Sequence, residues 1–182
     1  MEATARCCER WGVEKVTVDD IARESRVSRA TLYRIFPGGR DTLFEARRVY
    51  ELDQFFDRLL TGVEGADGLM ELLARTISVA TRELRADEHL AVMLATEPGA
   101  VLSDLTADGV PRIVRVATTY LVPLLDPYVP RDLGRRIIDV AARLVISYFL
   151  APSDDIDLAD EAQARAFIEP FVMSLAPDLT TR

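Results

Sequence analysis

The side chains of this chain that could do chemistry gather in one short segment, residues 28–34. Within seven positions the segment carries two arginines, a serine, a threonine and a tyrosine. An arginine can donate two hydrogen bonds to a guanine edge, and hydroxyl groups can donate to phosphate oxygens. With one histidine in the chain, no Ser-His-Asp or Cys-His arrangement accompanies them, so we expect no enzymatic activity. The residue types are typical of a surface that reads DNA.

Two short helices must position these side chains. Thr17 can cap a helix over residues 18–25, and Asp20, three positions later, completes a capping-box pattern. Ser28 can cap the next helix, which ends near Phe36 because Pro37 and the two glycines after it cannot continue it. Helices separated by about three residues pack across each other as a helix–turn–helix. The expected seam comprises Ile21, Ala22, Val27 and Leu32.

The exposed half of the second helix would then lie in the major groove. We expect Arg29 to bind a guanine edge, and Ala30 or the methyl group of Thr31 to contact a thymine methyl. Phosphate contacts position such a helix without reading sequence, and Thr17, at a helix start, can provide another. The residues predicted to bind DNA are Thr17, Ser28, Arg29, Ala30, Thr31, Tyr33, Arg34 and Arg40, with Ser28, Tyr33 and Arg40 as phosphate anchors.

On spacing alone, the alternative is a small helical hairpin with a solvated arginine face. Three motifs favour the DNA-binding interpretation: Thr17-Val18-x-Asp20-Ile21-Ala22, Val27-Ser28-x-x-Thr31-Leu32-Tyr33-x-x-Phe36 and Arg40-Asp41-x-Leu43. Together they resemble the TetR family of bacterial transcriptional regulators over about residues 3–48. Beyond residue 50 only size and helical character agree with that family.

The segment departs from the family pattern at several positions. Arg26 stands where a turn glycine is usual, so we expect a left-handed backbone without glycine there. Ala30 replaces a frequent glycine, Arg40 replaces the usual lysine, and the loop at 37–39 is one residue longer. No basic arm precedes the first helix. We therefore expect either a natural start upstream or the loss of the arm's minor-groove contacts.

The charge of the chain is unevenly divided. The formal net charge is -8, but residues 1–48 carry ten Arg or Lys against eight Asp or Glu. Residues 26–48 hold six arginines and two acids, and residues 49–182 hold twelve basic against twenty-two acidic residues. Because phosphate affinity depends on a local patch, an acidic protein can bind DNA in this way.

Composition predicts a cytoplasmic protein without a cofactor or metal. No apolar run is long enough for a membrane span, and no leader pattern is present. The adjacent Cys7 and Cys8 cannot form an ordinary disulfide framework, and one histidine does not make a zinc site. The resemblance places both cysteines where the TetR family carries large apolar residues in the first helix, so buried packing is favoured over a thiol sensor.

The pattern is all-α, with about nine helices. We expect a DNA-binding domain at 1–45 and a helical effector-binding and dimerisation domain at 46–182. Helices are expected at about 2–10, 18–25, 28–36, 41–60, 69–85, 87–96, 111–125, 131–150 and 159–175, with Asp41 capping the fourth.

The resemblance implies a homodimer built from the last two helices, and both are widely apolar. The residues predicted at the dimer interface are Ala141, Leu144, Val145, Tyr148, Phe167, Ile168, Phe171 and Val172. The resemblance also implies a pocket for a small apolar effector between the middle helices. Its candidate lining, for which plain core packing is the alternative, is Met70, Leu73, Ile77, His89, Met93, Val114, Ala117 and Tyr120.

These features together predict a ligand-responsive transcriptional repressor that binds an inverted-repeat operator as a homodimer. Effector binding would shift the fourth helix and so change the spacing of the two recognition helices. The alternative is a helix–turn–helix protein that organises DNA or answers to a protein partner, without a small-molecule effector.

Overall fold

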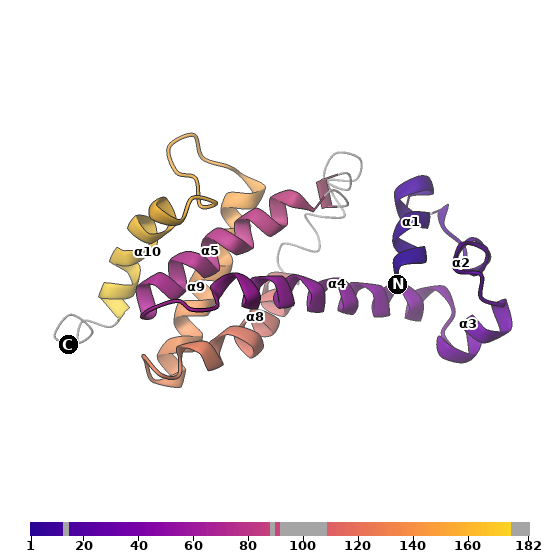
Figure 1. Cartoon of the computed structure of the whole chain (residues 1–182), viewed down its shortest axis with the longest axis horizontal. Coiled ribbons are helices and arrows are strands. Elements are labelled where there is room, and N and C mark those ends of the chain that lie inside the picture. The colour runs from indigo at the N-terminus through magenta and orange to yellow at the C-terminus, as the bar shows by residue number, and fades with distance from the viewer. Residues whose placement is uncertain (13–14, 88–89, 92–108, 176–182) are drawn as a thin grey trace. The chain divides into compact units, whose positions relative to one another are not determined.

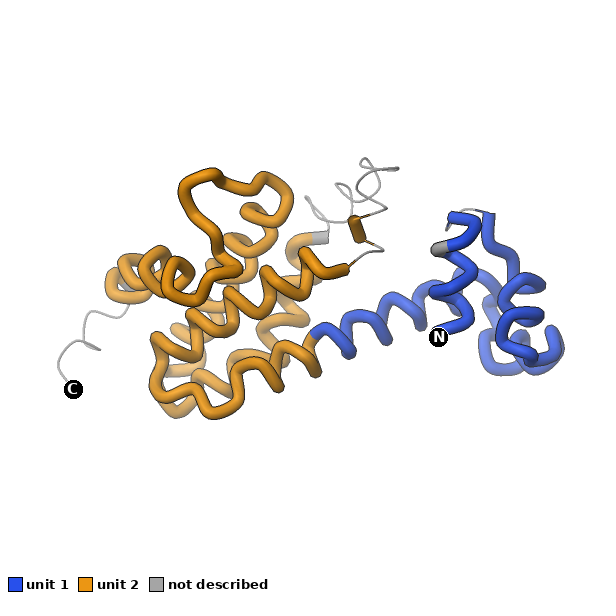
Figure 2. Tube along the Cα trace, turned by 45° about the horizontal axis from the view of Figure 1, so that its top comes forward, with its two compact units in different colours: residues 1–55 blue, residues 56–182 orange. Residues whose placement is uncertain are grey.

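The structure is a computed structural model that describes residues 1–12, 15–87, 90–91 and 109–175. These residues form an all-α fold of eight helices without strands (Figure 1). The helices are α1 (Glu2–Trp11), α2 (Val18–Ser25), α3 (Arg29–Ile35), α4 (Arg40–Val63), α5 (Leu69–Ala86), α8 (Gly109–Leu125), α9 (Arg131–Leu150) and α10 (Glu161–Leu175). The chain divides into two compact units, Met1–Phe55 and Phe56–Arg182 (Figure 2).

The first unit is built around a small apolar core. Its buried residues come from α1, α2, α3, the first turn of α4 and the segment before α2, and are Cys7, Cys8, Val16, Val18, Ile21, Ala22, Leu32 and Leu43. Val27, Phe36 and Phe44 pack against this core. The seam predicted between the two short helices is therefore confirmed. Because the seam buries one side of α3, the opposite side of that helix faces solvent.

The short turn between α2 and α3 depends on one residue with a left-handed backbone. Arg26 adopts the left-handed conformation, with φ 56° and ψ 28°. Its N–H donates to Arg23 O at 3.3 Å, and the Val27 N–H donates to Ala22 O at 3.1 Å. These two bonds form a Schellman motif, which satisfies the last carbonyls of α2. The left-handed residue expected at position 26 is confirmed, and it costs about 1–2 kcal/mol because arginine has a Cβ.

The start of α4 differs from the sequence prediction. The helix begins at Arg40, and the Leu43 N–H donates to Gly39 O at 3.1 Å, so Gly39 precedes the first helical residue. The predicted cap at Asp41 is therefore wrong. The glycine pair allows the early start: Gly39 has φ 64°, and a Cβ at Gly38 would lie 1.9 Å from Thr42 Oγ1. The prediction failed because Asp41 has a good capping side chain while the backbone freedom lies two residues earlier.

The second unit packs α5, α8, α9 and α10 around a larger core. α8 packs on α9, while α5 packs on both α9 and α10. Gly134 is buried where α9 packs on α8, and a Cβ there would lie in ordinary contact with Leu125, 3.6 Å from its Cβ. Phe56 stacks on Tyr120 with ring centroids 4.5 Å apart. Apolar packing forms the core of this unit, and ion pairs such as Arg85–Asp157 link its elements at the surface.

Most helix positions in the second unit follow the sequence prediction. The ranges expected at 69–85, 111–125, 131–150 and 159–175 correspond to α5, α8, α9 and α10 within two residues at each end. The helix expected at 87–96 lies largely outside the described residues. Across the described ranges, none of the helices has the length and apolar character that a membrane crossing requires.

Candidate nucleic-acid interface

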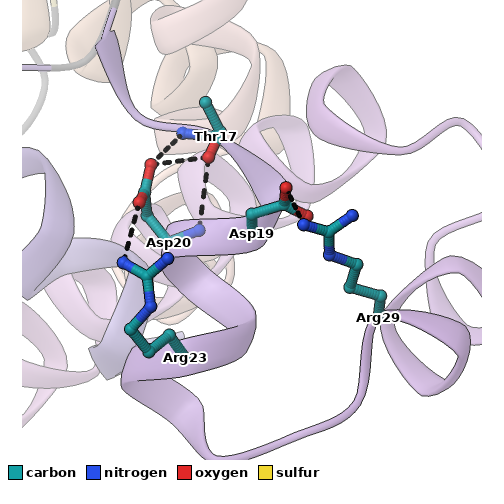
Figure 3. A network of polar contacts seen from close by, with 5 residues as sticks. All are labelled: Thr17, Asp19, Asp20, Arg23 and Arg29. Atoms are coloured by element: carbon teal, nitrogen blue, oxygen red, sulfur yellow. Dashed lines mark hydrogen bonds and ion pairs between the residues drawn. The ribbon is translucent and has the colours of Figure 1, made fainter.

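A reciprocal hydrogen-bond pair begins α2. The Asp20 N–H donates to Thr17 Oγ1 at 3.2 Å, and the Thr17 N–H donates to Asp20 Oδ2 at 3.1 Å (Figure 3). The Thr17 hydroxyl also donates to the same carboxylate oxygen at 2.5 Å. These bonds from Thr17 hold the pKa of the Asp20 carboxyl below its usual value. The predicted capping box is confirmed, but it uses the Thr17 hydroxyl proton that a phosphate contact would need.

A second cap begins α3. The Thr31 N–H donates to Ser28 Oγ at 3.1 Å, and the two hydroxyl oxygens of these residues lie 2.9 Å apart. Ser28 is the N-cap residue, as expected. Because the cap satisfies one backbone donor and leaves others at the helix start, this end of α3 favours a nearby phosphate.

The predicted reading face is largely solvent-exposed. Ser28, Arg29, Ala30, Tyr33 and Arg34 are exposed. Thr31 is half-buried, and Leu32 is 7% exposed because it belongs to the core. Of the predicted positions on α3, Thr31 therefore has the least surface to offer a base.

Arg29 has a partner that sequence spacing did not reveal. Its guanidinium donates to the carboxylate of Asp19, in the first turn of α2 (Figure 3). The side chain of Arg29 is still 65% exposed and that of Asp19 is 40% exposed. A guanidinium has five donors, so one edge can hold Asp19 while another meets a guanine. The structure thus adds Asp19 to the candidate interface.

Arg40 has a more internal position than predicted. Its Nε donates to Val16 O at 3.0 Å, and its guanidinium lies over the Phe44 ring at 4.6 Å. These contacts hold the start of α4 against the segment that enters α2. The side chain remains 40% exposed, so a phosphate contact at this position stays a prediction.

Only part of the positive charge predicted from residues 26–48 is exposed at the surface of the first unit. Arg47 is 4% exposed, and its Nε donates to Glu51 at 2.7 Å. Its charge is therefore used inside the unit. The same interior holds Cys7 and Cys8, both free and buried, and burial raises the pKa of each thiol. A protonated, buried thiol is a poor nucleophile, which favours packing for this pair.

Comparison with known proteins agrees with this geometry. Residues 1–46 match the model of the bacterial regulatory proteins of the tetR family. Two uncharacterised HTH-type transcriptional regulators, from two strains of Mycobacterium tuberculosis, are each 31% identical over 97 residues. This alignment covers 53% of the chain and 49% of each relative, so the chain spans about half the length of the curated relatives it matches.

The N-terminal domain belongs to the TetR family.

Solved structures extend the likeness of fold along the rest of the chain. The TetR family repressor AlkX from Dietzia sp. strain DQ12-45-1b, implicated in biodegradation of n-alkanes, has a TM-score of 0.68 at 24% identity. That match covers 95% of this chain and 92% of AlkX. The fatty acid degradation regulator FadR from Bacillus halodurans has a TM-score of 0.54 at 16% identity, covering 97% and 96% of the two chains. At these identities the comparison establishes the fold alone.

Several residues predicted to line an effector pocket belong to the packed core of the second unit. Leu73, Ile77 and Ala117 are buried, with at most 4% exposure. Tyr120 is half-buried and stacked on Phe56. Met70 and Val114 are half-buried, whereas His89 and Met93 lie outside the described residues. The pocket itself stays a prediction.

The residues predicted at the dimer interface divide into two groups. Ala141, Val145, Ile168 and Val172 are buried within one copy of the chain. Tyr148, Phe167 and Phe171 form a continuous aromatic cluster across α9 and α10, with centroid separations of 5.2 Å and 5.8 Å. Phe171 is 43% exposed, and half-buried Leu144 lies on the same helix as Tyr148. Leu144, Tyr148, Phe167 and Phe171 are therefore the predicted interface residues that keep exposed surface, and the interface itself stays a prediction.

Proposed function

We propose that this chain is a DNA-binding transcriptional regulator that reads base edges with α3. The observation that supports it best is the orientation of α3 in a TetR-family domain. Ser28 caps the helix and Leu32 anchors one side in the core, which leaves Arg29, Tyr33 and Arg34 exposed. Hydroxyl and guanidinium groups on a capped helix start match both phosphate and guanine contacts.

The proposed assembly is a homodimer. The aromatic cluster ends in exposed Phe171, and an exposed aromatic side chain beside two others is a favourable self-association surface. A two-fold axis would place two copies of α3 over an inverted repeat, because each half-site meets the same helix.

The proposed mode of control is repression relieved by a small apolar effector. AlkX is a repressor and FadR is a regulator of fatty acid degradation, and both share this fold. The alternative is a helix–turn–helix protein without an effector. A core packed solid around Leu73, Ile77 and the Phe56–Tyr120 stack, with no space for a ligand, would support that alternative.

Selection of bound sequences from random DNA tests the reading function. We expect an inverted repeat with half-site centres about 10 base pairs, or a multiple of that, apart. Arg29→Ala should then weaken operator binding by about 1–3 kcal/mol and relax one guanine position. An enriched pool without any motif, or unchanged binding by both Arg29→Ala and Tyr33→Phe at physiological salt, would contradict this function.

Two further measurements test the assembly and the effector. Sedimentation of Phe171→Asp should show dissociation, whereas Tyr128→Asp is the matched control because Tyr128 is also exposed, at 38%. Equal behaviour of the two variants would contradict the proposed interface.

A thermal-shift screen of lipophilic compounds, followed by a measurement of operator release, separates the ligand-responsive repressor from its alternative.

A further inference from the structure

The second unit has a surface cleft between α8 and the start of α9. The cleft has a volume of about 410 Å³ and is lined by Arg115, Thr118, Thr119, Val122, Arg131 and Arg135. The α8 residues recur at helical spacing along one face, and the α9 residues occupy its first two turns. A cavity of this size suits a small molecule. None of these six residues belongs to the predicted effector pocket.

The three arginines are an unusual group in this part of the chain. Residues 49–182 carry twelve basic and twenty-two acidic residues, yet three guanidinium groups line one cleft. Arg131 and Arg135 stand at the start of α9, where the helix macrodipole disfavours cations. Arg135 contacts Asp132 at 3.5 Å, and for Arg115 and Arg131 no ion pair is formed with another described residue. Three positive groups therefore line one cleft, with Asp132 as the one acidic residue paired to any of them among the described residues.

The α8 side of the cleft also offers hydrogen-bond acceptors. The Thr118 hydroxyl donates to Val114 O at 2.6 Å, and the Thr119 hydroxyl donates to Arg115 O at 3.0 Å. With their protons used in this way, both oxygens present lone pairs that accept hydrogen bonds. Val122, on the same face of α8, adds apolar surface to the cleft. The cleft thus combines donors for an anion with acceptors for a hydroxyl.

We propose that this cleft binds a small phosphate ester that carries hydroxyl groups, of the sugar-phosphate class. Arg115, Arg131 and Arg135 would hold the phosphate, since guanidinium groups match its oxygens in pairs. Thr118 and Thr119 would accept from the hydroxyl groups of the ligand. A DNA backbone is a poorer occupant, because it would bring many phosphates against an acidic unit.

Isothermal titration calorimetry of the full chain tests this site, with ribose 5-phosphate, inorganic phosphate and ribose as probes at matched ionic strength. We expect saturable binding of ribose 5-phosphate at least five-fold tighter than inorganic phosphate, and none of ribose. Arg115→Gln and Arg131→Gln should each weaken ribose 5-phosphate by at least ten-fold. Arg136→Gln is the matched control, because it removes the same charge from the same helix outside the cleft.

Circular dichroism of every variant establishes that the helices are retained. Arg29→Gln serves as a second control, since the first unit also carries exposed arginines. The proposal is overturned if ribose 5-phosphate does not saturate, or if the ester binds no tighter than inorganic phosphate. Equal weakening by Arg136→Gln or Arg29→Gln would also overturn it, because binding would then follow overall charge rather than this cleft.

Discussion

Arg29 at the start of α3 is ion-paired with Asp19 in the first turn of α2. The residue predicted to read a base is therefore held by a residue of the other helix. An acidic side chain beside a DNA-facing surface lowers affinity for phosphate but can fix the direction of a guanidinium. The pair thus connects the packing of the two helices to the selectivity of the proposed interface.

Removing Asp19 should separate its effect on phosphate affinity from its effect on the direction of the Arg29 guanidinium. We expect Asp19→Ala to bind random-sequence DNA more tightly and to lose about 1 kcal/mol of discrimination for guanine at the Arg29 position. Fluorescence anisotropy with operator and guanine-substituted operator measures both quantities. In an Arg29→Ala background the same substitution should leave discrimination unchanged, because the pair no longer exists. Full discrimination in Asp19→Ala would show that Arg29 is not directed by this contact.

We expect the absence of a side chain at Gly39 to affect the position of the Tyr33 ring as well as the backbone conformation. It has φ 64°, and a Cβ there would lie 3.1 Å from Tyr33 Cε1. We expect Gly39→Ala to lower the free energy of unfolding by about 1–2 kcal/mol and to weaken operator binding, since the tyrosine ring must move. Gly12→Ala is the control, with φ 79° and no atom within 4 Å. Urea unfolding and gel shift of both variants check this, and equal DNA affinity would exclude a positioning role for Gly39.

Arg26 is a site where glycine should stabilise the fold. Arginine holds φ 56° at the end of α2, where glycine avoids a cost of about 1–2 kcal/mol but loses some of it to unfolded-chain entropy. We expect Arg26→Gly to gain about 0.5–1 kcal/mol in urea unfolding. Arg23→Gly, inside the same helix, should lose about 1 kcal/mol. A loss in both variants would indicate that the Arg26 side chain makes a stabilising contact worth more than the backbone strain.

Two carboxyl groups of the first unit should make its folding stability sensitive to acid. The Asp20 pKa is lowered by hydrogen bonds from Thr17, and the Glu24 pKa is lowered chiefly by the Arg6 guanidinium, whose Nε donates to Glu24 at 2.7 Å. Because the unfolded state binds these protons more readily, stability is present above the ordinary carboxyl pKa of about 4 and is lost as pH falls toward the folded-state values.

Thr17→Val tests this linkage at one residue. Without the hydroxyl, the Asp20 pKa should move back toward its ordinary value, so the decline in stability between pH 5 and pH 2 should become shallower. Urea midpoints measured across that range for wild type, Thr17→Val and Glu24→Gln give the comparison. An acid decline of the same steepness in Thr17→Val would exclude the Thr17–Asp20 bonds as a source of it.

Local features of this protein could be predicted from the sequence. The caps at Thr17 and Ser28 and the left-handed Arg26 depend on residues within five positions, and all three are present. The recurrence of apolar residues at helical spacing likewise predicted the helices of both units, because one apolar face must be buried in each. The cap at Asp41 failed for a local reason too, since Gly39 allows an earlier start.

Contacts between helices were decided only by the tertiary structure. Arg29 meets Asp19, Arg40 donates to Val16 O, and Arg115 shares a cleft with Arg131 because core packing sets how the helices cross. Charge counting treated the arginines of residues 26–48 alike, but the fold buries Arg47 and leaves Arg34 exposed. The sequence by itself determined the capped helix that we propose reads DNA. Which charges face solvent, and which are held by a partner, follows from packing between residues far apart in the chain.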